Sequence, residues 1–171
     1  MSKQLLFCVE TNKGARTDCI YIEETIKRFY IVGNGVRKRF VYLNGKSNYN
    51  KPRTVKDIER QTKQYESIGP TMVIYFIDTD RCDTDPAQAK ELEDIFKYCQ
   101  KNNYELVWFC KDVEDVYWGE QVHKDVKKEK ASQFRSSKAI NMLSEATLSR
   151  KTQAHHFSNI LDVLDKHLER K

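Results

Sequence analysis

The sequence lacks several features that mark whole classes of protein. It has 3 prolines, 6 glycines and no low-complexity segment, and its 39% hydrophobic and 32% charged residues are typical of a globular rather than a disordered chain. No apolar run has the length of a membrane-spanning helix, and the opening MSKQLLFCVE has too short an apolar run for a secretory signal. We therefore expect a cytoplasmic protein with no membrane segment.

Motifs for nucleotides and metals held by cysteine are also missing. There is no Walker motif, and GNG at residues 33–35 lacks the GxGxxG continuation, so it is predicted to be a turn. The five cysteines are an odd number without CxxC or Cys/His spacing, which indicates reduced thiols rather than a zinc site or a disulfide framework. If ATP is involved, an ATPase partner protein would have to bring it.

Short apolar strands alternate with helical segments along the first 110 residues. Strands are predicted at 4–10, 36–44, 72–77 and 104–110, and helices at 17–31, 54–67 and 86–101. Thr17 or Asp18 is expected to cap the first helix, and Asp85 the third. From about Asp112 the pattern is helical, at 112–122, 136–148 and 157–168.

This order predicts an α/β fold with a mainly parallel four-stranded sheet between helices, plus C-terminal helices. The 171 residues are the size of one domain. Residues 1–119 are expected to form the α/β core, and residues 120–171 a basic connector and C-terminal helices that pack on the same domain.

Four aspartates follow the strand in TMVIYFIDTDRCDTDP, at positions 78, 80, 83 and 85. An EF-hand opening at Asp78 would need Gly and Glu where Asp83 and Ala89 stand, so that interpretation fails. A DxDxT phosphotransferase would need Thr in place of Cys82. A sugar-nucleotide transferase with an Asp-x-Asp metal site stays open as an alternative, as does an exposed acidic turn that binds nothing.

Asp78 and Asp80 are two residues apart, so in extended backbone both side chains point to one side and can converge on one cation. Glu10 ends the first strand, and the carboxyl ends of parallel strands meet at one edge of a sheet. Magnesium prefers a few carboxylates together with waters and phosphate oxygens. We therefore predict a Mg²⁺ or Mn²⁺ site formed by Glu10, Asp78 and Asp80.

The net charge is +5, and the positive residues gather in GVRKRF (Arg37 to Arg39) and between Lys124 and Lys138. A basic rim around an acidic spot suits a polyanion held over bound cations, although charge runs are more often simply solvated. His155 and His156 have no carboxylate at useful sequence spacing, so a solvated pair is expected there. Trp118 is expected to lie in the core or, if exposed, to stack on a base.

The combination of a Glu that ends the first strand and a later strand that ends in Asp-x-Asp resembles the Toprim domain of topoisomerases, primases and related nucleases. More narrowly, the chain resembles the RloB-like branch associated with bacterial phage defence. The matching stretches are FCVE, Thr17-Asp18, Tyr21-Ile22, IYFIDTD, FCKDVEDVYWG and FSNILDVLDKHL. Two features depart from the family pattern: Thr11 replaces a Gly, and the loop TNKGARTD is longer than usual.

The resemblance implies magnesium-dependent phosphodiester cleavage of DNA or RNA. Asp78 and Asp80 would bind the metal, Glu10 would act as general acid/base or as a further ligand, and Asp83 and Glu114 (or Asp112) would support a second ion. The candidates for holding phosphate or nucleic acid are Lys13, Arg16, Arg37, Arg39, Arg81, Lys127 and Lys128. Because Thr11 and the loop differ from the family, a non-catalytic subunit that binds nucleic acid or a partner is the alternative.

Overall fold

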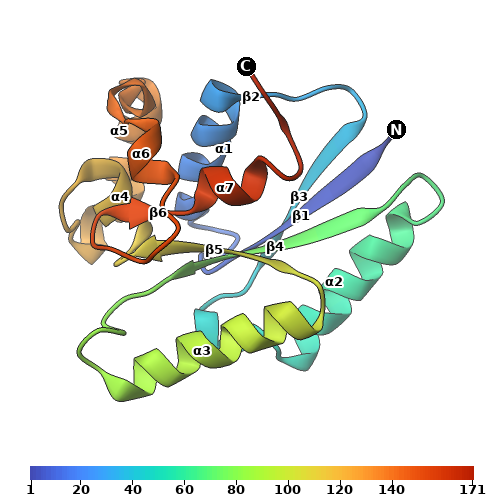
Figure 1. The fold of residues 1–171 in the computed structure, drawn as a ribbon, viewed down its shortest axis with the longest axis horizontal. Helices are drawn as coiled ribbons and strands as arrows, with labels where there is room; N and C mark the ends of the chain where they lie inside the picture. Colours follow the sequence, from blue (N-terminus) through green and yellow to red (C-terminus); the bar gives the residue numbers. More distant parts are fainter.

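The computed structural model describes residues 1–171 and places a five-stranded sheet between two layers of helices (Figure 1). The sheet contains β1 (Lys3–Val9), β3 (Val36–Tyr42), β4 (Thr71–Asp78), β5 (Glu105–Cys110) and β6 (Phe157–Ser158). Their order is β3-β1-β4-β5-β6, with the first four parallel and β6 antiparallel to β5. The predicted α/β fold with a mainly parallel sheet is confirmed, with β6 as a fifth strand that the sequence pattern did not predict.

The helices are α1 (Thr17–Phe29), α2 (Pro52–Tyr65), α3 (Pro86–Lys101), α4 (Val113–Trp118), α5 (Lys127–Ser136), α6 (Glu145–Leu148) and α7 (Ile160–Leu164). Three short 3₁₀ turns are η1 (Lys46–Asn48), η2 (Lys124–Val126) and η3 (Ala139–Met142). Helices α2 and α3 cover one face of the sheet, and α1 and the C-terminal helices cover the other (Figure 1). None of the helices is both long and apolar enough to cross a bilayer.

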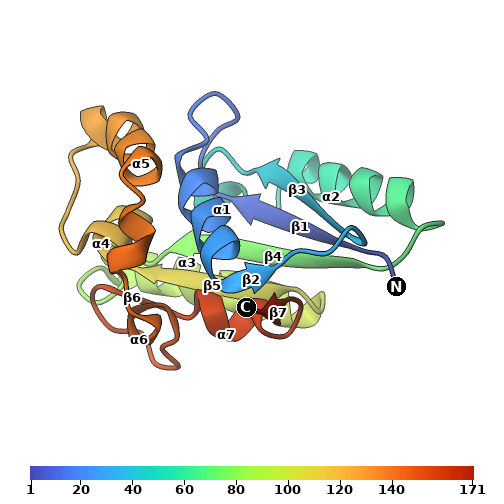
Figure 2. The ribbon, with the colours of Figure 1, turned by 90° about the horizontal axis from the view of Figure 1, so that it is seen from above.

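Two apolar clusters hold these layers together. Side chains alternate along β1, so Leu5 and Phe7 pack with α1 in a cluster of 25 buried residues, while Leu6 and Cys8 pack with α2 and α3 in a cluster of 11. The larger cluster also contains Phe134 of α5, which lies beside α1 (Figure 2). Residues 120–171 therefore share their hydrophobic core with residues 1–119.

The sequence predicted the N-cap of α3 correctly and the N-cap of α1 incorrectly. Asp85 caps α3 because its carboxylate accepts hydrogen bonds from the amides of Ala87 and Gln88, which confirms the predicted cap. The predicted cap of α1 is wrong: Arg16 occupies the N-cap position without a side-chain bond. Asp18 lies in the first turn of α1 and accepts a hydrogen bond from the Thr11 amide instead, at 3.2 Å.

The prediction of one helix over residues 157–168 is wrong. Phe157 and Ser158 pair with Cys110 and Phe109 of β5, and only Ile160–Leu164 is helical. The Asn159 side chain accepts from the Trp108 amide and donates to the Leu106 carbonyl, which fixes this short strand on the sheet. The predicted helix at 136–148 is likewise divided, into η3 and α6.

A last short pairing joins the end of the chain to the end of α1. Strand β2 (Tyr30–Ile31) pairs antiparallel with β7 (Glu169–Arg170). In the main sheet, by contrast, β1, β3, β4 and β5 all pair parallel and run in the same direction. Their carboxyl ends therefore share one edge of the sheet.

Candidate functional site

Acidic side chains gather at this carboxyl edge of the sheet. Glu10 follows β1, Asp78 ends β4, and Asp112 and Glu114 lie at the junction of β5 with α4. These groups lie close enough to affect one another. The charges of Glu10, Asp18, Asp112 and Glu114 all raise the pKa of Asp78, in addition to the effect of its burial. We call the following six residues the acid cluster: Glu10, Asp18, Asp78, Asp80, Asp112 and Glu114.

Glu10 and Asp78 are the central pair of the cluster. The Glu10 Oε2 atom accepts a hydrogen bond of 2.7 Å from the Asp78 amide. This bond joins the end of β1 to the end of β4. Burial raises the pKa of Glu10 to about 8, although the bond from Asp78 opposes the shift. Burial, together with the charge of Glu10, also raises the pKa of Asp78 well above its usual value. Glu10 therefore favours the protonated form at neutral pH unless a cation is present, and the pKa of Asp78 is shifted in the same direction.

Two lysines supply positive charge to the cluster. Lys46 of η1 donates to the Asp78 carbonyl oxygen at 3.0 Å and forms an ion pair with Asp80. Lys127, at the start of α5, lies 2.8 Å from Glu114 Oε2 and 3.5 Å from Asp112 Oδ2. The neighbouring acids raise the pKa of each lysine despite the opposing effect of burial. Two ammonium groups facing six carboxyls leave the cluster acidic.

Asp78 and Asp80 have different partners. Asp78 Oδ1 accepts from the Val113 amide at 3.0 Å, toward α4, whereas Asp80 bonds to Lys46. Asp80 lies after the strand, where its backbone is left-handed with a φ of 48°. The i, i+2 rule on which the sequence argument relied describes extended backbone, so it does not apply at Asp80.

Glu114 has one buried carboxylate oxygen without a hydrogen-bond partner. Its side chain is only 1% exposed; Oε2 meets Lys127, but Oε1 has no hydrogen-bond partner. A buried carboxylate oxygen without a partner is costly, and burial accordingly raises the pKa of Glu114. An all-oxygen donor set with one unsatisfied oxygen fits a hard divalent cation such as Mg²⁺.

The remaining predicted acid and its neighbour lie at the outer end of this region. Asp83 is exposed, and its Oδ2 lies 3.5 Å from Lys111 Nζ. Arg81 is also exposed, and its backbone amide donates to the Gln88 side chain.

Basic residues line a groove of about 1170 Å³ between the loop after β1, strand β3 and helix α2. Asp57 is the one acid among its 18 lining residues. Lys13, Arg16 and Arg39, three of the predicted phosphate-binding residues, are part of it. We call the following eight residues the basic groove: Lys13, Arg16, Lys38, Arg39, Lys51, Arg53, Lys56 and Arg60.

Other predicted basic residues lie outside this groove. The Arg37 guanidinium is positioned over the Tyr65 ring, 5.6 Å from its centroid. Lys127 belongs to the acid cluster, while Lys128 beside it is exposed. Trp118 is partly buried, and its Nε1 donates to the Tyr21 hydroxyl at 3.1 Å. A Trp118 held in this way packs against the core.

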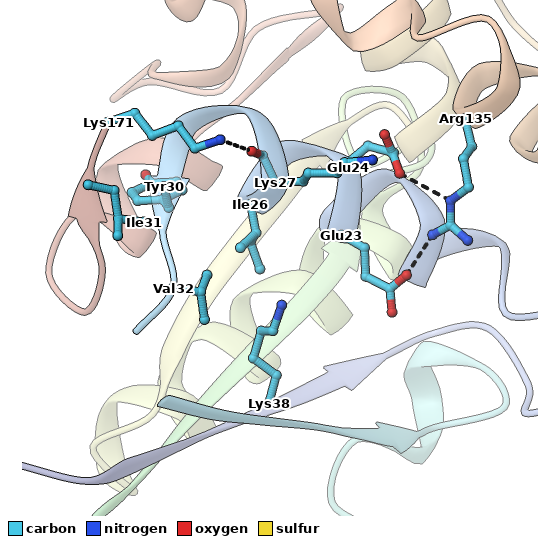
Figure 3. A pocket seen from close by; sticks show the side chains of 10 residues that line it. All are labelled: Glu23, Glu24, Ile26, Lys27, Tyr30, Ile31, Val32, Lys38, Arg135 and Lys171. Atoms are coloured by element: carbon cyan, nitrogen blue, oxygen red, sulfur yellow. Dashed lines mark hydrogen bonds and ion pairs between the residues drawn. The ribbon is translucent and has the colours of Figure 1, made fainter. Parts of the chain in front are cut away.

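A second pocket, of about 760 Å³, lies at the side of α1 (Figure 3). Glu23 and Glu24 of α1 pair there with Arg135 of α5, and Lys38 points toward them from β3 (Figure 3). Lys171 donates to the Lys27 carbonyl at 2.6 Å. None of the residues that line this pocket belongs to the acid cluster.

His155 and His156 are partly solvated as expected, but the expectation missed that both also meet a carboxylate from a distant part of the chain. His155 Nε2 lies 2.8 Å from Asp115 Oδ2, and His156 Nδ1 lies 3.2 Å from Asp115 Oδ1. Asp115, His155 and His156 offer ligand atoms that all lie within 4.8 Å of one another, so this group could hold a metal ion. Asp115 and His155 are 40 positions apart, so no short sequence motif contains the group. No three acids of the acid cluster meet the same distance limit.

Sequence reasoning also left Asp18 and Lys46 out of the site. Asp18 belongs to the Thr-Asp pair matched to the RloB-like pattern, so that resemblance was the signal that could have found it. Lys46 had no signal, because it lies in a polar loop and reaches the site only through the tertiary fold. No family model, curated protein or solved structure matches the chain.

Proposed function

We propose that the protein is a magnesium- or manganese-dependent phosphodiester hydrolase that acts on DNA or RNA. One observation above all supports this proposal: carboxyls from three adjacent strand ends share an edge of the sheet, and burial raises the pKa of Glu10, Asp78 and Glu114. Groups shifted in this way are typical of functional sites. The resemblance to Toprim and RloB-like proteins supports the same activity.

A divalent cation fits the acid cluster because the donors are all oxygens, two lysines leave it acidic, and Glu114 Oε1 has no partner. Asp78 and Glu114 are the groups that would hold it, with Asp80 on the side of Lys46 and with Glu10 either as a further ligand or as the general acid/base. When bound, such an ion polarises a phosphate and stabilises the charge that develops on its oxygens.

The chain's own residues can move protons and bind phosphate. Glu10, with a pKa of about 8, can both hold and release a proton near neutral pH, which suits a general acid/base. Lys46 keeps its charge, since the neighbouring acids raise its pKa, and its ammonium can pair with a phosphate oxygen in place of Asp80.

The basic groove leads toward the acid cluster. Lys13 and Arg16 lie on the loop that begins directly after Glu10. At the other wall, the Gly45 amide donates to the Glu10 carbonyl at 2.9 Å, next to η1 and Lys46. A nucleic-acid backbone bound along the groove would therefore bring phosphates to the edge of the sheet where the carboxyls lie.

The test is manganese- and magnesium-dependent degradation of a panel of single- and double-stranded DNA, RNA and tRNA. Asp78→Asn keeps the shape of the side chain but removes its charge, and we expect a loss of about 1000-fold, since the ion supplies several kcal/mol of charge stabilisation. Asp94→Asn, at a half-exposed position on α3 far from the acid cluster in the sequence, is the matched control and should cleave like the wild type. Equal cleavage by wild type and Asp78→Asn would remove this site from the proposal.

One observation favours a second candidate, a non-catalytic module that binds nucleic acid. Lys46 already neutralises Asp80, and the ligand atoms of Glu10, Asp78 and Asp80 are not gathered within 4.8 Å of one another. This candidate predicts tight binding of nucleic acid with no cleavage by the wild type in either metal. A Mg²⁺ soak of a crystal that shows an ion on Asp78 would count against it.

The resemblance to RloB-like proteins supports a role in prokaryotic phage defence, in the cytoplasm and together with an ATPase partner protein. The five cysteines are all free, as a reducing compartment would allow. Plating phage on cells that express the chain tests this role. Protection that is equal with wild type and Asp78→Asn would separate defence from the proposed chemistry.

A further inference from the structure

The sequence Ala154-His155-His156 lies against the start of α4, and the two histidine rings stack on each other there. Their centroids are 3.8 Å apart, with 18° between the ring planes. Nε2 of His155 and Nδ1 of His156 are directed at the two oxygens of Asp115. Two imidazole nitrogens and two carboxylate oxygens therefore face one another at this point.

The spacing of these donors suits one ion. Ligands placed about 2.0–2.2 Å from a tetrahedral ion lie about 3.3–3.6 Å from one another. The three ligand atoms already lie within 4.8 Å, so only small rotations of the side chains would be needed. Asp115 is 4% exposed, while the side chains of His155 and His156 are 52% and 43% exposed, which leaves a path for the ion from solvent.

Supporting contacts orient the carboxylate. The Lys111 amide donates to Asp115 Oδ2 at 3.1 Å, and the Asp115 amide donates to Asp112 Oδ1 at 2.8 Å. The His156 amide donates to the Cys110 carbonyl at 2.7 Å, so the backbone on the histidine side is also fixed. Such outer contacts are typical of metal sites, where they hold the ligands in place.

The chemistry of the donors selects the class of ion. Two imidazole nitrogens and one carboxylate suit Zn²⁺ and related transition metals, whereas Mg²⁺ prefers oxygen ligands only. Glu114 and Asp115 are successive residues of α4, about 100° apart around the helix, so they face different surroundings. The histidine group is therefore separate from the acid cluster.

We propose that Asp115, His155 and His156 bind one divalent transition-metal ion of the zinc class, and that this ion clamps residues 154–156 to the junction of β5 and α4. Three protein ligands leave one position for water or for a further ligand from solvent. Because the junction contains Asp112 and Glu114, the clamp also fixes the α4 side of the acid cluster. The proposal does not depend on the hydrolase activity.

The test is titration of the metal-free protein with Zn²⁺, followed by calorimetry and by thermal unfolding. The wild type should bind one equivalent and unfold at a higher temperature with Zn²⁺. His155→Ala/His156→Ala should bind more than about 100-fold more weakly, since removal of a supporting outer-shell residue alone costs about 10–100-fold. His123→Ala is the matched control, because His123 also pairs with a carboxylate, Asp125, but has no second histidine.

Further measurements address the ligand set. Co²⁺ in the wild type should show d–d bands without a sulfur charge-transfer band, and excess Mg²⁺ should not displace Zn²⁺. His155→Gln alone removes one half-exposed ligand, which limits damage to the fold, and should weaken binding by about tenfold or more, the effect expected when such a site is impaired. The proposal is overturned by no Zn²⁺ binding in the wild type, by equal binding in the double variant, by a sulfur band, or by displacement with Mg²⁺.

Discussion

Helix α4 lies between the acid cluster and the group of Asp115, His155 and His156. Both contain buried carboxylates, but different partners balance the negative charge. On one side, six carboxyls of the acid cluster face two lysines, and Glu114 Oε1 is left without a partner. On the other side, Asp115 accepts a backbone hydrogen bond and meets two histidines. The first cluster can be completed by protons or by a hard cation, and the second has nitrogen donors for a softer one. Adjacent residues of one short helix thus serve two chemically distinct sites.

The acid cluster, unlike the histidine group, relies on lysines for positive charge. We expect the largest loss of stability from a single substitution in Lys127→Met. The change leaves Glu114 buried without its cation, which should lower the free energy of unfolding by about 3 kcal/mol in metal-free buffer. Mg²⁺ should restore part of the loss if the cluster binds it. Chemical denaturation with and without Mg²⁺ measures both effects.

Lys128→Met is the control for this experiment, since Lys128 is adjacent but exposed. The two variants should differ clearly in metal-free buffer. If they are equally stable there, the acid cluster does not depend on Lys127 for its charge balance.

A smaller effect is expected when the basic groove is weakened. Arg39→Gln/Arg53→Gln should lower affinity for nucleic acid and reduce the slope of log K against log salt by about 1.8, or about 0.9 for each phosphate that is no longer neutralised. Binding measured by fluorescence anisotropy at several salt concentrations gives this slope. Lys97→Gln/Lys101→Gln on α3 removes the same charge away from the groove; an equal reduction in both variants would show that only net charge matters.

The smallest change in the free energy of unfolding, counted per pH unit, concerns the protonation of Glu10. Burial raises the pKa of Glu10 to about 8 from 4.5, so between these values the folded state holds a proton that the unfolded state has released. This proton stabilises the metal-free protein at low pH, and the benefit is lost as the pH rises toward 8, by at most about 1.4 kcal/mol per pH unit. Glu10→Gln cannot ionise, so its stability should fall less steeply from pH 5 to pH 8.

Denaturant unfolding at a series of pH values, without metal, measures this dependence. Glu66→Gln, at an exposed position, should retain the wild-type slope. A slope in Glu10→Gln as steep as that of the wild type would mean that the other acids of the cluster, and not Glu10, take up the protons.

Patterns within short segments predicted the frame of the molecule. The apolar run of β4 and the Asp85-Pro86 start of α3 were readable because strand burial and helix capping depend on neighbouring residues. The same reasoning failed for residues 157–168, where an apolar stripe of helical spacing was overridden by pairing of Phe157 and Ser158 with β5. Hydrogen bonds to a distant strand satisfied the backbone there in place of a helix.

The sequence by itself determined that Glu10 and Asp78 lie at the carboxyl ends of two strands, because the apolar runs that form strands are local, and the alternation of strands with helices indicated a parallel sheet. Only the tertiary structure decided the rest of the two clusters: Lys46 and Lys127 come from a turn and a distant helix, and Asp115 meets histidines from the far end of the chain. Such meetings depend on how helices and loops pack over the sheet edge. The spacing of residues along the chain does not predict these contacts, because they form only when the whole hydrophobic core is buried.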